Sequence, residues 1–530
     1  MKRNAALALF GIGALVVAGC GSSATGRGTP GGKVVGGGTF TMALNADPGN
    51  LDPQQNIINP AIQLGFFAYD GLLEPDADGK IVSGLASAWK VAGRTVKLTI
   101  RQNVTCSDGA RFTAADAAAN LNYVADPKNK SPLLGVFLPA GAHAVADSAA
   151  STVTITLVKP APFVLYGLAN LGMVCAKGMN NRASLAHQTD GTGPYQLTAS
   201  VPGNQYTYSK RAGYAWGPNG AATTAPGLPD KIVARVVTDQ STAANLLLSG
   251  GINAAIVTGT DAARLDRANL FGSSATEIEG EMWFNQASGR PGADKAIRQA
   301  LTQAIDLTQL RQVLTSGRGE PPTTFAASTP IACSGNSIGD ALPPHDLEAA
   351  KHLLDAAGWT VGAGGIRQKD GQALALTFVY DASTGPSGTA AVEFAMAAWK
   401  QLGVKVTGKA QDPSTVSQTV FGTGQWDIVW ATINVGSPDQ LVPFLSGTVP
   451  PGGTNFAHIH NDAYEAAIAK AETLPVPAGC PSWLSAETNI VRDVDALPFA
   501  NEKSTMYGSR ARFAQVGNDL LPTTIQMLGH

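Results

Sequence analysis

Residues 39–53 read TFTMALNADPGNLDP, and the fold follows from the way this stretch begins. From residue 38 to residue 44 polar and apolar side chains alternate, and this period of two is typical of a strand with one buried face. The residues that follow are rich in Asn, Asp, Pro and Gly, which are typical of a loop. The sequence therefore predicts that the folded body starts near Thr39 with a strand that leads into a loop.

Further strand and helix patterns alternate along the body. The same alternation predicts strands at residues 96–101 and 152–158. Helical periodicity predicts four helices, at residues 113–123, 294–305, 346–357 and 390–402. The last two end at Gly358 and Gly403, as expected of glycine just after a helix. Such a mixture predicts an α/β fold built from more than one lobe.

The bulk composition limits the classes of protein to which this chain can belong. A chain of 530 residues is too long for one hydrophobic core and suggests about three domain-sized units. With 44% hydrophobic and 14% charged residues, it should fold rather than stay disordered. A net charge of −2 and a pI near 6.4 provide no basic surface for phosphate backbones, so no nucleic acid partner is expected.

Residues 1–20 read MKRNAALALFGIGALVVAGC and have the pattern of an export signal. Lys2 and Arg3 form a basic start, and residues 5–17 form an uncharged apolar run. This run is shorter than the roughly 20 residues that span a membrane. The sequence therefore predicts a cleaved signal peptide over residues 1–19 rather than a transmembrane anchor.

The end of this segment, Val17-Ala18-Gly19-Cys20, resembles the bacterial lipobox. The resemblance implies that Cys20 is diacylated and becomes the mature N-terminus, so that two acyl chains hold the protein to the membrane. Residues 20–38 are rich in Gly, Ser and Thr and predict a flexible tether. We therefore expect an extracytoplasmic protein that is lipid-anchored to the bacterial cell membrane.

Four cysteines remain in the body once Cys20 is set aside: Cys106, Cys175, Cys333 and Cys480. An even number of cysteines in an exported protein predicts two disulfides, with three possible pairings. None of them forms a C-x-x-C pair, so the sequence gives little support to zinc or thiol redox chemistry.

Several segments of the body, taken together, resemble the extracellular solute-binding proteins of family 5. This family contains dipeptide- and oligopeptide-binding proteins of ATP-driven importers. The similar segments occur in the family's order across nearly the whole mature chain, at residues 39–53, 69–73, 85–89, 98–115, 191–195, 284–285, 294–306, 349–359, 402–404, 426–428 and 455–456. No single segment is decisive, and the resemblance lies in their shared order.

The resemblance implies a two-lobed periplasmic-binding-protein-like fold of the cluster C type, with an extra subdomain on the first lobe. Lobe I is expected over residues 39–66, 186–280 and 493–530, the subdomain over residues 67–185, and lobe II over residues 281–492. Pairing Cys106 with Cys175 and Cys333 with Cys480 is favoured, because each pair then falls within one expected lobe. The resemblance also implies a monomer that captures a short peptide between the lobes and delivers it to ABC permease subunits.

By the same resemblance, the ligand site is expected to include the loop after the first strand, the strand that enters lobe II, and the end of the strand at residues 426–429. The residues expected to line it are Asn45, Ala46, Asp47, Trp283, Asn285, Trp430 and Asn434. Peptide-binding members place an aspartate a few positions after the counterpart of Trp430, where it pairs with the amino terminus of the peptide. This chain has Ala431-Thr432-Ile433-Asn434 there, so the expected carboxylate is missing.

Other functions have weaker support in the sequence. Residues 335–339 fit G-x-S-x-G, but the flanking prolines and the missing apolar strand favour a loop over a hydrolase elbow. His458 and His460 could offer nitrogen to a transition metal, but a solvent-exposed loop is favoured for them. We expect no enzyme, no metal and no cofactor. The remaining alternatives are another solute, such as a sugar oligomer, a nickel complex or a glutathione-like compound, and a surface scaffold without a transport role.

Overall fold

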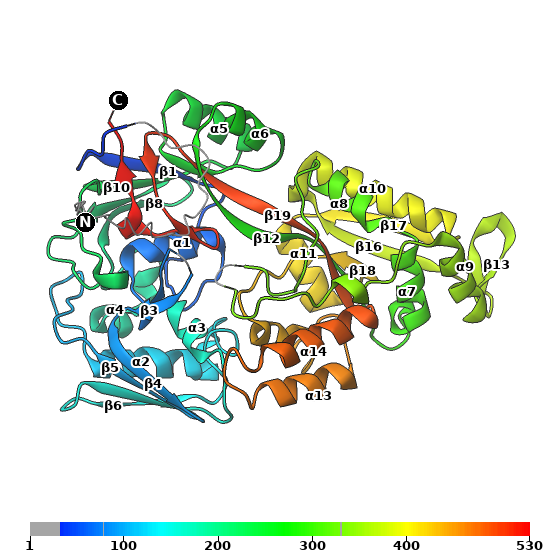
Figure 1. Ribbon diagram of the computed structural model, residues 1–530, viewed down its shortest axis with the longest axis horizontal. Coiled ribbons are helices and arrows are strands. Elements are labelled where there is room, and N and C mark those ends of the chain that lie inside the picture. The colour runs from blue at the N-terminus through cyan, green and yellow to red at the C-terminus, as the bar shows by residue number, and fades with distance from the viewer. Residues whose placement is uncertain (1–31, 78, 329–330, 530) are drawn as a thin grey trace, which may run out of the picture.

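The computed structural model describes residues 32–77, 79–328 and 331–529. The predicted signal peptide, Cys20 and most of the predicted tether lie outside these residues. Two large halves are connected by a pair of long strands, β12 (Phe271–Phe284) and β19 (Ala496–Gly508), which cross from one half to the other (Figure 1). Within the described ranges, no helix combines the length and apolar character that a bilayer crossing requires.

One mixed sheet passes through both halves. Its order is β17-β16-β18-β12-β19-β11-β1-β10-β9-β8. The strand bounds, in that order, are Lys405–Gln411, Ala375–Asp381, Ile428–Trp430, Phe271–Phe284, Ala496–Gly508, Ala254–Ile256, Thr39–Leu44, Lys231–Val236, Gln205–Lys210 and Tyr195–Val201. The predicted first strand is therefore β1, and Phe40, Met42 and Leu44 face the core, as the alternation requires.

Lobe I surrounds the β1 end of this sheet. Its helices are α1 (Asn59–Ala68), α5 (Gln240–Ser249) and α6 (Gly259–Arg267). Short strand pairs complete it, namely β20 (Ala511–Arg512) with β23 (Gln526–Met527) and β21 (Gln515–Val516) with β22 (Asp519–Leu520). The buried side chains of β1, α1, β9 and β10 form its core.

A subdomain lies beside lobe I and has its own four-stranded sheet of order β4-β5-β7-β6. Its strands and helices are β2 (Leu73–Pro75), β3 (Ile81–Ser83), β4 (Ala86–Ala92), β5 (Thr95–Ile100), α2 (Ala114–Ala125), β6 (His143–Asp147), β7 (Thr152–Thr156), α3 (Val164–Ala169) and α4 (Ala176–Asn180). Thr113 and Asp116 form a capping box at the start of α2. The predicted strands at 96–101 and 152–158 correspond to β5 and β7, and the predicted helix at 113–123 corresponds to α2.

Lobe II contains the other end of the large sheet and most of the helices. Its remaining elements are α7 (Lys295–Gln303), α8 (Leu307–Leu314), α9 (Leu347–Ala356), β13 (Thr360–Val361), β14 (Arg367–Lys369), β15 (Gln372–Ala373), α10 (Gly385–Gln401), α11 (Pro413–Ser417), α12 (Val442–Leu445), α13 (Asp462–Ala471) and α14 (Cys480–Arg492). Asp294 and Asp346 cap α7 and α9. The helix predicted at 390–402 begins earlier, at Gly385, because Pro386 occupies its first turn, where a missing N–H costs nothing.

Two disulfides join residues far apart in the sequence. Cys106 pairs with Cys175 within the subdomain, and Cys333 pairs with Cys480 within lobe II. These are the two pairs that the sequence favoured. The exact lobe boundaries stay predictions, but the α/β two-lobed fold with a subdomain is the fold that the chain adopts.

Candidate ligand site between the lobes

The strand directions define where a ligand can meet both lobes. β12 runs from lobe I into lobe II, and β19 returns beside it. In lobe I, β11 is antiparallel to β19, and β1 is parallel to β11. In lobe II, β18 is antiparallel to β12, and β16 is parallel to β18. The carboxyl ends of β1 and β11 therefore point toward lobe II, and those of β16 and β18 point toward lobe I. In open α/β sheets ligands bind at the carboxyl ends of strands.

The loop after β1 follows the carboxyl end of that strand, on the side of lobe I that points toward lobe II. Asn45 and Ala46 are exposed, whereas Asp47 is fixed to the β8–β9 turn. Its carboxylate accepts hydrogen bonds from the backbone N–H of Gly203 and from the hydroxyl of Tyr206, the latter at 2.8 Å. Partial burial raises the pKa of Asp47, but these hydrogen bonds outweigh it and hold the pKa below its ordinary value. Asp47 therefore holds this loop in place as a charged group.

Trp283 and Asn285 do not reach the junction, contrary to the sequence-based expectation. Trp283 has no exposed surface, packs on Phe456 at a ring distance of 4.9 Å, and donates from Nε1 to the carbonyl of Ala431. Asn285 is 2% exposed and donates to the carbonyl of Trp426 at 3.0 Å. Both side chains are occupied inside lobe II, because the inward-facing positions of β12 are filled by the core there.

Trp430 and Asn434 lie at the end of β18 and just beyond it. The ring of Trp430 packs between Phe378 and Phe499, at 4.9 Å and 5.0 Å, and its buried Nε1 has no hydrogen-bond partner among the described residues. Asn434 is exposed, but its amide is engaged on both sides. Its Oδ1 accepts from the N–H of Ile278 at 2.8 Å, and its Nδ2 donates to the carbonyl of the same residue at 3.1 Å. Asn434 thus binds its loop to β12 and is not a substitute for the missing aspartate.

The crossing strands carry acidic side chains at the junction that the sequence-based expectation did not include. Glu277, Glu279 and Glu281 alternate along β12, and Glu502 on β19 is the register partner of Glu277. The turn of the β21–β22 hairpin brings Asp519 beside Glu277. Irregular pairing at Ile278–Glu281 places two bulges in this part of the β12–β19 ladder.

Burial and mutual repulsion raise the pKa values of these carboxyl groups. Glu279 keeps solvent-exposed surface but lies in a crowded part of the junction. Partial loss of hydration, together with the negative charges of Glu502, Glu277 and Asp381, raises its pKa to about 7. Burial and the charge of Glu277 raise the pKa of Asp519 to about 8. Burial also raises the pKa of Glu281 to about 8, and only the N–H of Ile433 and the side chain of Trp283 oppose this shift. Such clustered shifts are typical of functional sites.

A second contact joins the lobes at the subdomain. Phe163, just before α3, is 1% exposed and belongs to the core of lobe II. Its ring lies 5.5 Å from that of Trp483 on α14. Close by, Lys159 forms an ion pair with Glu472 at 2.6 Å. The subdomain therefore inserts the ring of Phe163 into the core of lobe II, so that it contacts lobe II at this point in addition to the connection through the crossing strands. Figure 1 shows the subdomain beside the part of lobe II that contains α14.

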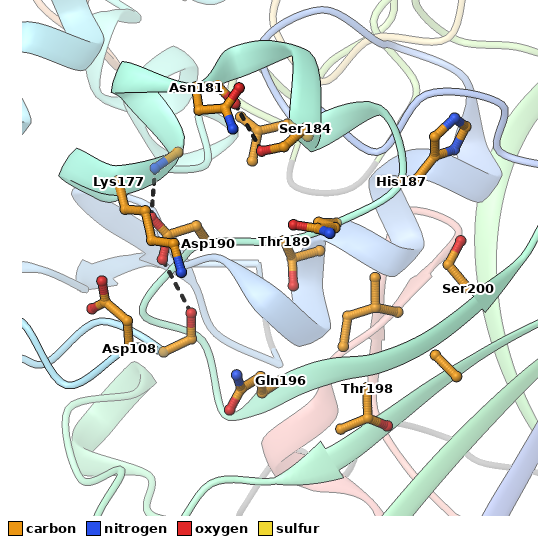
Figure 2. Close-up of a pocket in the computed structure, with 16 residues that line it drawn as sticks. Asp108, Lys177, Asn181, Ser184, His187, Thr189, Asp190, Gln196, Thr198 and Ser200 are labelled. Atoms are coloured by element: carbon orange, nitrogen blue, oxygen red, sulfur yellow. Dashed lines mark hydrogen bonds between the residues drawn. The ribbon is translucent and has the colours of Figure 1, made fainter.

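A polar hollow of about 530 Å³ lies elsewhere, on lobe I (Figure 2). One wall is β8, the edge strand of the large sheet, and the other is the segment that follows α4. Its polar lining residues include Asp108, Lys177, Asn181, His187, Thr189, Asp190, Gln196, Thr198 and Ser200. All of its lining residues come from lobe I and the subdomain, so movement of lobe II could not enclose a ligand there.

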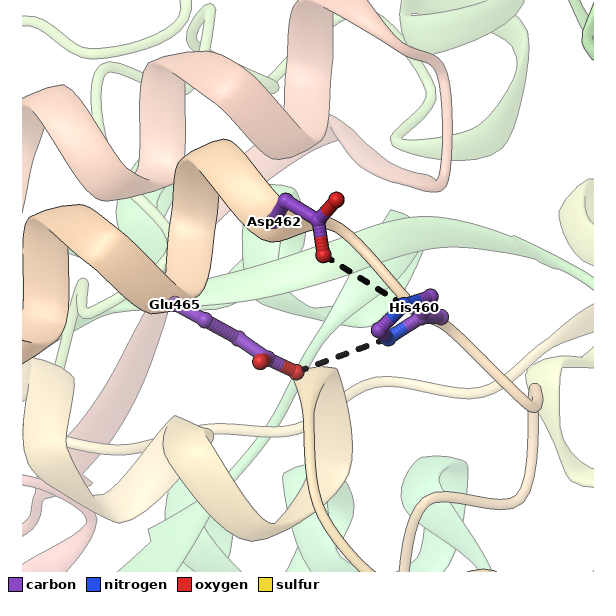
Figure 3. Close-up of side chains that lie close together, drawn as sticks. All are labelled: His460, Asp462 and Glu465. Carbon is purple, nitrogen blue, oxygen red and sulfur yellow. Dashed lines mark ion pairs between the residues drawn. The ribbon is translucent and has the colours of Figure 1, made fainter.

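The motifs considered for metal binding and catalysis lie outside the junction. His460 lies 3.4 Å from Asp462 and 3.7 Å from Glu465 at the start of α13 (Figure 3). The side chains of His460 and Asp462 are 77% and 93% exposed, so water competes strongly for any ion there. His458 is only half-buried rather than fully exposed. Ser337 of the G-x-S-x-G motif is buried in a loop and donates to Glu487, and no histidine among the described residues forms a hydrogen bond with its hydroxyl.

Fold and junction define a two-lobed solute-binding protein, and comparisons with known proteins agree. The family model of the bacterial extracellular solute-binding proteins, family 5 (Middle), matches residues 80–455. Because this match covers more than half of the chain, the protein belongs to that family. It is a solute-binding protein of the ABC importer type.

Among its relatives is the periplasmic murein peptide-binding protein MppA of Escherichia coli K12, 26% identical over 81% of both chains. The unliganded open form of MppA matches the present fold with a TM-score of 0.69 at 22% identity, covering 94% of this chain and 99% of that one. The glutathione-binding protein GsiB of Salmonella typhimurium is 27% identical over 81% of this chain and 82% of its own. The oligopeptide-binding protein AppA of Bacillus subtilis, in complex with a nonapeptide, has a TM-score of 0.76 at 17% identity, covering 94% and 100% of the two chains.

Proposed function

We propose that this protein captures a short peptide at the junction between its lobes and delivers it to the permease of an ABC importer. The observation that carries the proposal is the meeting of strand ends from both lobes across β12 and β19. A ligand placed there contacts both halves at once, so it stabilises the form in which they touch. Relatives named for murein peptide, glutathione and oligopeptide binding support a peptide-like solute.

Closure of the two lobes around the ligand makes binding specific. Bringing the lobes together removes water from the ligand, so hydrogen bonds and charge contacts become stronger. Phe163 and Lys159 are placed to make contacts that exist only while the lobes touch. The permease can then distinguish a filled protein from an empty one by its shape.

A thermal-shift assay with purified mature protein tests the peptide assignment. Peptides of two to five residues should raise the melting temperature, because a ligand at 100 times its Kd adds about 2.7 kcal/mol of stability. Glutathione, sugar oligomers and nickel–histidine complexes serve as comparison solutes, and native mass spectrometry shows whether a retained ligand masks the shift. A shift with one of these solutes and none with any peptide would overturn the peptide assignment. If none of the solutes changes the melting temperature, the role as a surface scaffold without transport is favoured.

The membrane anchor is part of the same proposal. We expect diacylated Cys20 to hold the protein at the outer face of the cell membrane, and the pattern of residues 1–20 supports this. Replacing Cys20 with serine should release the protein into the soluble extracytoplasmic fraction, while the wild type stays with the membrane fraction. Equal membrane association of both forms, measured by fractionation and immunoblotting, would contradict lipid anchoring.

A further inference from the structure

The carboxylates at the junction have few cationic partners. Among the described residues, no lysine or arginine forms an ion pair with Glu277, Glu279 or Asp519. Glu502 lies 3.3 Å from Arg318, which also pairs with Asp266 at 3.2 Å. This part of the junction thus holds more negative than positive charge, and part of it is open to solvent at Glu279.

Unpartnered acceptor oxygens at the same place are an independent observation. Gln515 is 8% exposed, and its Oε1 has no hydrogen-bond donor among the described residues. Oδ1 of Asn518, at the turn of the β21–β22 hairpin, also has no hydrogen-bond donor among the described residues. The amide of Gln515 donates to the carbonyl of Gly517 at 2.7 Å, and that of Asn518 donates to Glu277. Both amides therefore lie at the hairpin turn, which faces the carboxylates.

Among the described residues, the unpartnered atoms at the β21–β22 hairpin are acceptors that lack a donor, whereas at the end of β18 the buried Nε1 of Trp430 lacks an acceptor. Two further buried oxygens on the crossing strands, Oε1 of the fully buried Glu281 and Oδ1 of Asn501, also accept no hydrogen bond from the described residues. Buried acceptors without donors are costly and rare in folded proteins. An ammonium or guanidinium group supplies several donors and a positive charge together, whereas a water molecule supplies donors without the charge.

We infer that Glu277, Glu279, Glu502 and Asp519 form a subsite for cationic groups of the ligand, and that the captured peptide carries a lysine or arginine side chain as well as its amino terminus. This inference rests on the proposed function and names the solute class of the same site. More than one positive charge is expected because the cluster holds four carboxyl groups, of which only Glu502 has a cationic partner, Arg318, among the described residues. The subsite also takes over the role of the aspartate that is absent after Trp430.

Matched peptides test the subsite directly. A tripeptide with a central lysine should bind at least about tenfold more tightly than the same tripeptide with the uncharged norleucine, because a charge-assisted hydrogen bond contributes about 1.5 kcal/mol or more. The preference should shrink as ionic strength rises. Calorimetry at pH 7 in two buffers should also show proton release. A bound cation lowers the raised pKa values of Glu279 and Asp519, so these groups lose protons when the ligand binds. The charged and titratable groups around these two residues are Glu277, Asp381, Glu502 and Arg318.

Glu279→Gln removes one charge without changing the shape of an exposed side chain, so the variant should fold normally. The variant should lose about tenfold in affinity for the lysine peptide and little for the norleucine peptide. Glu393→Gln, at an exposed position on α10, is the matched control and should bind both peptides as the wild type does. Equal binding of the two peptides by the wild type, or an unchanged preference in Glu279→Gln, would overturn the inference.

The outcomes separate this inference from the proposed function. If neutral peptides bind as tightly as cationic ones, the peptide function stands and the cationic subsite is wrong. If no peptide binds but a polyamine such as spermidine does, and Glu279→Gln weakens that binding, the subsite stands and the peptide function is wrong.

Discussion

Replacing Phe163 with alanine should weaken ligand binding by up to about a hundredfold. Truncation of a buried phenylalanine typically costs about 3 kcal/mol or more. Phe163 is buried against Trp483 of the opposite lobe, so most of this cost falls on the form in which the lobes touch. A shift of about 3 kcal/mol changes the balance between separated and touching lobes roughly a hundredfold, and affinity falls with it.

Calorimetry and small-angle scattering measure the two parts of this expectation. The Phe163→Ala variant should have a larger radius of gyration than the wild type at the same ligand concentration. Phe112→Ala is the control, because the core in which Phe112 is buried contains residues of the subdomain and lobe I but none of lobe II. That variant should melt at a lower temperature but keep its affinity. An unchanged affinity in Phe163→Ala would show that this contact takes no part in closure.

Removing the lobe II disulfide should lower the free energy of unfolding of that lobe by about 5 kcal/mol. Cys333 and Cys480 are 147 residues apart, and closing so long a loop removes much entropy from the unfolded chain. Cys106 and Cys175 are 69 residues apart, so replacing that pair should cost the subdomain about 4 kcal/mol. The measurement is guanidinium unfolding of each Cys→Ser double variant.

A chain with several lobes need not unfold in one step, so the effects of the two disulfides can be measured in separate unfolding transitions. Each double variant should shift the transition of its own part and leave the other near its wild-type midpoint. Reduction of the wild type with dithiothreitol should reproduce both shifts. A double variant that unfolds at the wild-type denaturant concentration would contradict the expected role of its disulfide.

Much of the fold could be predicted because local patterns and tertiary structure agree. The alternation at residues 38–44 gives β1, and Asp294 and Asp346 cap helices where the periodicity places them. The start of α10 was placed too late, because its first turn is Gly- and Ser-rich and lacks an apolar period. Proline in the first turn is the local signal that could have located it.

The positions of candidate site residues are harder to predict than the fold, because they depend on contacts between distant parts of the sequence. The resemblance implied Asn45, Ala46 and Asp47 as ligand-site residues, and these follow a strand end that points toward lobe II, so their role in ligand binding stays a prediction. It also proposed Trp283 and Asn285, whose burial depends on packing against residues more than a hundred positions away. No local pattern reports such distant partners. The glutamates of Thr276-Glu-Ile-Glu-Gly-Glu281 were the overlooked signal, since three alternating carboxylates directly before the apolar run Met282–Phe284 are uncommon.

The two bulges at Ile278–Glu281 have a mechanical consequence. Both lobes share one continuous sheet, so they can rotate only by twisting the two strands that connect them, and the twist concentrates where ladder hydrogen bonds are already interrupted. Side chains near such a pivot travel least during rotation. A cationic ligand group bound to Glu279 would therefore keep this contact while the lobes rotate. It would bind before the lobes close and dissociate only after they open.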